Sequence, residues 1–166
     1  MDAPSYKKKE KKGLSLIHRE QRTKRGGGVG ILFNKSKVTV RKMPLAGNIF
    51  EAVAACGKLV NDTRKSVIFS VYMPPSTLVD GVNKFNEFLS DNLMKIKADV
   101  DDPYINIAGN TNKSDIKPAL AKSPDVCMVD TPASRGDDKL DVLAINLSTQ
   151  ISEIRAHTHP YYSQWD

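Results

Sequence analysis

Four polar side chains lie at the ends of predicted strands and are the strongest candidates for chemistry. Tyr72 ends one apolar stretch, Asn110 and Asn112 follow a second, and Asp141 begins a third. Carboxylate and amide oxygens are hard ligands that suit Mg²⁺, and a metal held at a strand end can activate a phosphate group. The sequence therefore predicts a site for a divalent metal and a phosphate at one rim of a sheet.

The central stretch, residues 104–112, is predicted to be a short buried strand that runs into a polar loop. Gly109 is expected to let the backbone turn sharply. Asn110 and Asn112 are two residues apart, so on an extended backbone they would project the same way. We expect any functional site to lie here.

Structural explanations for the same residues stay open. The stretch after residue 108 is also typical of an ordinary Asn-rich turn. Tyr72 is compatible with a plain half-buried aromatic, and Asp141 with a cap between loop and strand. His157 and His159 lie in a polar tail and are interpreted as exposed loop residues rather than ligands.

The remaining elements are mostly strands. Apolar and β-branched runs predict strands at 14–17, 29–33, 38–40, 49–56, 66–72, 126–129, 140–147 and 151–156. Apolar residues at helical spacing predict a helix over 82–98, and 116–121 suggests a short helical turn interrupted by Pro118. This order predicts an α+β or mixed α/β sandwich.

Size and composition indicate one globular domain. The chain has 166 residues, 40% of them hydrophobic. No apolar run is long enough to cross a bilayer, and the charged N-terminus does not resemble a secretory signal. Cys56 and Cys127 are interpreted as buried thiols in a reducing compartment rather than metal ligands, which predicts an intracellular protein, cytoplasmic or nuclear.

The positive charge is concentrated at the N-terminus. Residues 1–25 hold nine basic and three acidic side chains, and therefore the whole formal net charge of +6. Such a segment attracts nucleic acid through phosphate contacts, but it is equally typical of a solvated tail or localisation signal. Residues 1–13 are predicted to be disordered. The candidate nucleic-acid contacts are Lys7, Lys8, Lys9, Lys11, Lys12, Arg19, Arg22 and, in the polar loop 131–139, Arg135.

Several motifs occur in an order that resembles a known family. They are GGGVGIL at 26–32, VYMPPS at 71–76, IAGNTN at 107–112, and TPASRG at 131–136 leading to Leu140-Asp141. The chain resembles the endonuclease/exonuclease/phosphatase (DNase I-like) family, and is most similar to the endonuclease domain of non-LTR, LINE-type retrotransposons. The resemblance implies a four-layer α/β/β/α sandwich with two packed mixed sheets, Mg²⁺ or Mn²⁺ as cofactor, DNA as partner and a parent reverse transcriptase polypeptide.

The resemblance also implies residue roles. Tyr72 stands where the family contacts the scissile phosphate, Asn112 where an asparagine positions it, and Asp141 where an acid orients the catalytic groups. Asn110 stands where the family has its catalytic aspartate, and an amide cannot act as a general base. We therefore expect impaired phosphodiester cleavage. A non-enzymatic nucleic-acid-binding module and a non-functional remnant remain alternatives.

Two further family motifs bear on the domain bounds. The family's metal-binding glutamate would precede Leu14, and its Ser-Asp-His motif would follow Asp166. We therefore expect residues 14–166 to form a domain truncated at both ends, with its metal ligands unknown. A phosphatase role within the family stays open, because a fold does not fix its substrate.

Overall fold

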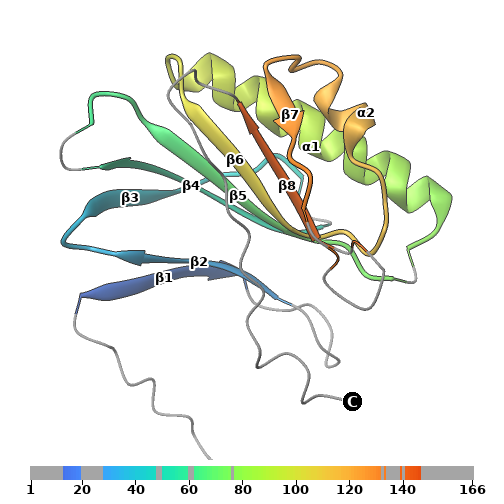
Figure 1. Ribbon diagram of the computed structural model, residues 1–166, viewed down its shortest axis with the longest axis horizontal. Coiled ribbons are helices and arrows are strands. Elements are labelled where there is room, and N and C mark those ends of the chain that lie inside the picture. Colours follow the sequence, from blue (N-terminus) through green and yellow to red (C-terminus); the bar gives the residue numbers. More distant parts are fainter. Residues whose placement is uncertain are drawn as a thin grey trace, which may run out of the picture.

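The computed structural model describes residues 13–19, 28–47, 50–59, 62–75, 77–131, 133, 139 and 141–146 (Figure 1). Its strands are β1 (Leu14–Arg19), β2 (Val29–Asn34), β3 (Val38–Met43), β4 (Glu51–Leu59), β5 (Ser66–Tyr72), β6 (Tyr104–Asn110), β7 (Val126–Met128) and β8 (Asp141–Asn146). Its helices are α1 (Val79–Asp99) and α2 (Lys117–Leu120). The predicted strand at 151–156 and the polar tail lie outside the described residues.

A six-stranded mixed sheet in the order β3-β4-β5-β6-β8-β7 forms the centre of the molecule. Only the β5–β6 pair within it is parallel. A parallel pair needs a crossover connection, which α1 provides by running back across one face of the sheet (Figure 1). The carboxyl ends of β5 and β6 therefore lie side by side at the same end of the sheet, and Tyr72 and Asn110 are the last residues of these two strands.

The helical face of the sheet carries the main hydrophobic core. β5 and β6 alternate, so that Val67, Phe69, Val71, Ile105 and Ile107 are all buried beneath α1. The opposing helix contributes the aromatic and leucine side chains of its apolar stripe, which are Phe85, Phe88, Leu89, Leu93 and Ile96. This core holds β5 and β6 rigidly against the helix.

A second sheet of two antiparallel strands, β1 and β2, covers part of the opposite face (Figure 1). It packs on β4 and β5 through a smaller cluster of buried residues, Val29, Ile31, Val53 and Ala55. The described residues thus form three layers: helices, a large sheet and a small sheet. The predicted mixed α/β architecture with two packed sheets is confirmed.

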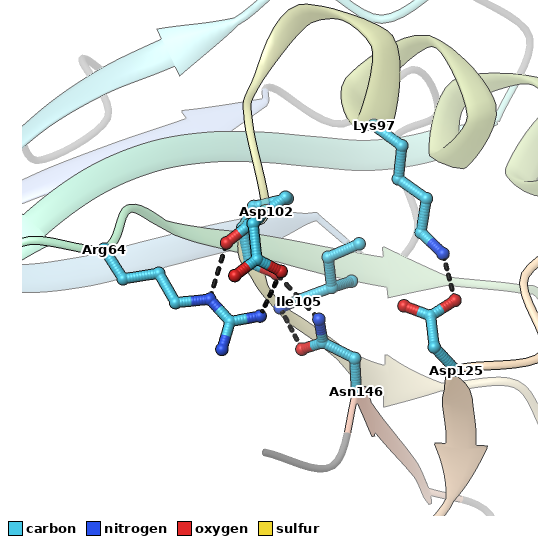
Figure 2. A network of polar contacts seen from close by, with 7 residues as sticks. Arg64, Lys97, Asp102, Ile105, Asp125 and Asn146 are labelled. Atoms are coloured by element: carbon cyan, nitrogen blue, oxygen red, sulfur yellow. Dashed lines mark hydrogen bonds and ion pairs between the residues drawn. The ribbon is translucent and has the colours of Figure 1, made fainter.

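Polar contacts anchor β6 at its amino end, opposite the edge that carries Asn110. The side-chain oxygen of Asn146 accepts the Ile105 N–H at 2.6 Å, and its nitrogen donates to the Pro103 carbonyl at 2.7 Å (Figure 2). Nearby, Arg64 is paired with Asp102 at 2.7 Å. The Asn146 contacts join β6 to β8, and the Arg64–Asp102 pair joins the segments that precede β5 and β6.

Three local expectations are wrong. Gly109 makes no turn; it pairs with Val71 inside β6, and a Cβ there would lie 1.8 Å from the Val71 carbonyl oxygen, so glycine is needed for close strand approach. Cys127 is exposed, because it lies between Val126 and Met128 on β7 and so faces away from the core that these two residues join, whereas Cys56 is buried as expected. Pro118 lies in the first turn of α2, where its missing N–H costs nothing, and does not interrupt the helix.

None of the described helices combines the length and apolar character that a membrane crossing requires.

Candidate functional site

Strand register places four polar residues in one row at the edge of the large sheet. Glu51 is paired with Tyr72, Tyr72 with Asn110, and Asn110 with Asp141. Directly paired residues share a face, so all four lie on the face opposite the buried Phe69. We call them the rim row. The structure thus brings together three of the residues that the sequence singled out.

Asn110 and Asn112 do not project the same way, because the chain leaves the extended conformation after β6. The Asn112 N–H donates to the side-chain oxygen of Asn110 at 2.9 Å, and Asn112 has φ of 48°. This is an Asx-turn, in which a short polar side chain replaces a backbone partner. Asn110 therefore serves as an acceptor that shapes the loop.

Asn112 ties this loop to the end of β5. Its side-chain nitrogen donates to the Met73 carbonyl at 2.6 Å, and the Met73 N–H donates to the Asn110 carbonyl at 2.9 Å. The residue after Tyr72 is thus held from both sides by the segment 110–112. This arrangement fixes Tyr72 relative to Asn110 and gives Asn112 a positioning role.

Two contacts link the β4 end of the rim row to the small sheet. A carboxylate oxygen of Glu51 accepts the Gly28 N–H at 2.8 Å, and the Arg19 guanidinium donates to the Phe50 carbonyl. Sequence reasoning missed Glu51, because an isolated glutamate at a strand start has no motif around it. Only its pairing with Tyr72 shows that it belongs to the rim row.

Other predicted contacts lie outside the described residues. These are Lys7, Lys8, Lys9, Lys11, Lys12, Arg22 and Arg135, together with His157 and His159. Of the candidate nucleic-acid contacts, Arg19 alone falls in the described part of the chain. The basic arm therefore stays a prediction.

In the described part of the chain, Asp141 beside Asn110 is the carboxylate of the rim row that could hold the metal expected from the family resemblance, because Mg²⁺ needs only one or two carboxylates in addition to substrate phosphates. Within that part of the chain, no three His, Cys, Asp or Glu side chains gather closely enough to hold an ion by themselves. Glu51 and Asp141 stand at opposite ends of the rim row. Three strand spacings separate them, about 14 Å, which is too far for a shared ion. Asp141 is the one carboxylate of the row directly beside Asn110.

Comparison with solved structures identifies the fold. The human Nocturnin catalytic domain, solved with a bound sulfate anion, matches 81% of this chain with a TM-score of 0.64 and 13% identity. A mannosyl-6-phosphatase from Bacteroides thetaiotaomicron matches 82% with a TM-score of 0.63 and 11% identity. The endonuclease domain of TRAS1, a telomere-specific non-LTR retrotransposon, matches 83% with a TM-score of 0.58 and 12% identity. The chain has the endonuclease/exonuclease/phosphatase fold.

The chain spans only part of these DNase I-like structures, from 61% of the Nocturnin domain to 67% of the TRAS1 domain. No protein-family model and no curated protein matches the sequence. The structural matches include a phosphatase and an endonuclease, so the fold leaves the substrate open.

Proposed function

We propose that the chain is a LINE-type endonuclease domain that binds DNA phosphodiesters at the rim row but cleaves them poorly. The observation that carries this proposal is the register Tyr72–Asn110–Asp141 across three neighbouring strands. The motif order resembles retrotransposon endonucleases, and the fold match to the TRAS1 domain supports it. In this proposal the parent polypeptide also carries a reverse transcriptase.

The side chains of the rim row are suited to hold a phosphodiester. The Tyr72 hydroxyl and the Asn110 amide nitrogen are neutral donors for phosphate oxygens. Asn112 holds Met73 and thereby keeps Tyr72 in place. These contacts bind and orient the substrate without moving a proton.

Proton transfer is the step that fails. A general base must accept a proton from the attacking water, and an amide has no such capacity at neutral pH. The Asn110 side-chain oxygen is already an acceptor for the Asn112 N–H. Aspartate at this position would keep that hydrogen bond and add a basic oxygen.

The test is nicking of supercoiled plasmid in the presence of Mg²⁺. The unmodified chain should stay near background, and Asn110→Asp should raise the nicking rate by about 100-fold, the size of a general-base contribution. Asn83→Asp, an exposed position on α1, makes the same charge change away from the rim row and should have no effect. Robust nicking by the unmodified chain would contradict the claim of impairment.

A further inference from the structure

An apolar groove of about 270 Å³ lies between the two sheets. We call the face of the large sheet opposite α1 its inner face. Ile31 and Phe33 of β2 belong to one wall of the groove, and the inner-face residues Val40, Ala55, Ile68 and Asn106 belong to the other. The groove is therefore part of the space that a complete pair of packed sheets would fill with side chains.

The small sheet covers only part of the inner face. β1 packs on β4, and β2 packs on β4 and β5, whereas β6 and β8 lie beyond them in the large sheet. Ile68 of β5 stays 37% exposed, and Ala108 of β6 is exposed. Among the described strands β2 is paired on one side only, with β1. Since β2 is the strand that reaches β5, its free edge faces the uncovered part of the inner face.

The burial of Ile145 indicates that further residues cover the inner face of β8. Ile145 is paired with Asn106 and therefore shares its face. Its side chain is only 3% exposed, although it belongs to neither of the two core clusters of the described residues. The residues that bury it therefore come from outside these clusters.

The chain itself supplies a segment at this place. β8 ends at Asn146, directly after Ile145 and therefore at the end of the sheet where Asn106 lines the groove. The four residues 147–150 can span about 13 Å when extended, and packed sheets lie about 10 Å apart. The segment 151–156, for which the sequence predicts a strand, can therefore reach the layer of the small sheet.

The sequence of this segment suits a strand with one buried face. On an extended backbone Ser152, Ile154 and Ala156 share one side, and Glu153 and Arg155 share the other. The first side is small and largely apolar, like the walls of the groove, and the second carries charges that favour solvent.

We propose that residues 151–156 dock in this groove as a third strand of the small sheet, beside β2. In this arrangement Ile154 packs on Ile68, and the chain's own residues cover the inner face of β6. The added strand also pairs the free edge of β2, which would otherwise be open to pairing with other chains. The groove lies at the amino ends of β5 and β6, opposite the rim row, so this proposal does not depend on the proposed function.

The test is NMR on the full chain with isotope-labelled isoleucine methyl groups. We expect nuclear Overhauser cross-peaks between the methyl groups of Ile154 and Ile68. Ile154→Asp places a charge on the buried side of the segment, so the backbone amides of residues 152–156 should exchange with solvent at least about tenfold faster. Absence of the Ile154–Ile68 cross-peaks in the unmodified chain overturns the proposal.

The matched control is Ile151→Asp, the same substitution on the side shared with Glu153 and Arg155. It should change the exchange of the same amides by no more than about twofold, and equal acceleration by both substitutions overturns the proposal. A mixture of labelled and unlabelled chains tests whether a second copy fills the groove instead. Cross-peaks from Ile68 to Ile154 within one chain support the proposal, and cross-peaks that arise between chains overturn it.

Discussion

The side-chain oxygen of Asn110 accepts the Asn112 N–H, and an aspartate oxygen would accept it equally well. The turn after β6 is therefore compatible with either residue. What differs between them is the ability to take a proton, which the turn does not use. For this reason Asn110→Asp is expected to keep the fold, so that its effect on nicking reports on chemistry.

Gly109 is the residue of β6 least able to change. A Cβ added there would lie 1.8 Å from the Val71 carbonyl oxygen, a backbone atom that cannot move without shifting β5. Gly109→Ala should lower the free energy of unfolding by about 3 kcal/mol, at the upper end of overpacking costs. The measurement is urea unfolding followed by circular dichroism.

The control for this substitution is Gly30→Ala in β2. Its new methyl group would meet the end of the exposed Leu16 side chain at 3.1 Å, which can move aside. The free energy of unfolding should then change by less than about 0.5 kcal/mol. If Gly109→Ala is tolerated equally well, the close approach of β5 and β6 does not hold in solution.

At the scale of the secondary-structure elements, the local sequence pattern was sufficient to predict an element where it is buried. The strand at 66–72 was predicted with its bounds as found, because it is rich in β-branched and aromatic residues. Helix α1 begins three residues before its predicted start at Val82. The residues added at this end begin with Val79, which is exposed like the preceding Leu78. They therefore contribute nothing to the apolar stripe. Apolar residues at helical spacing indicate which part of a helix is buried, so a helical turn that is exposed is not predicted from this spacing.

Helix α1 is also joined to the segment 115–119, which leads into and forms α2, by the buried side-chain amide of Asn86. Asn86 accepts the Ala119 N–H and donates to the Asp115 carbonyl, both at 3.1 Å. Asn86→Ala should cost about 1–3 kcal/mol of stability, because the buried Asp115 carbonyl loses this donor and the Ala119 N–H keeps only the Ile116 carbonyl. Asn83→Ala on the exposed side of α1 should be neutral in the same urea titration. Equal effects would mean that helix propensity, rather than the amide, decides the outcome.

At the scale of the whole molecule, the rim row could not be read from the sequence. Motifs located Tyr72, Asn110 and Asp141, but their alignment depends on the strand order β5-β6-β8, which local pattern does not determine. Glu51 entered only with the antiparallel pairing of β4 and β5.

The two sheets differ in how strongly they are held. The large sheet packs on the extensive core beneath α1, whereas β1 and β2 are held by the small cluster around Ile31 and Val53. The free energy of local opening rises with the amount of buried apolar contact, so backbone amides of β1 and β2 should exchange with solvent faster than those of β6.

Ile31→Ala should speed the exchange of the β1 and β2 amides further and leave that of β6 unchanged. Leu32→Ala, at a position 64% exposed, should alter the exchange of neither sheet. Hydrogen exchange followed by NMR measures the amide exchange rates of both sheets. Equal acceleration in β2 and β6 would show that the two sheets open as one unit.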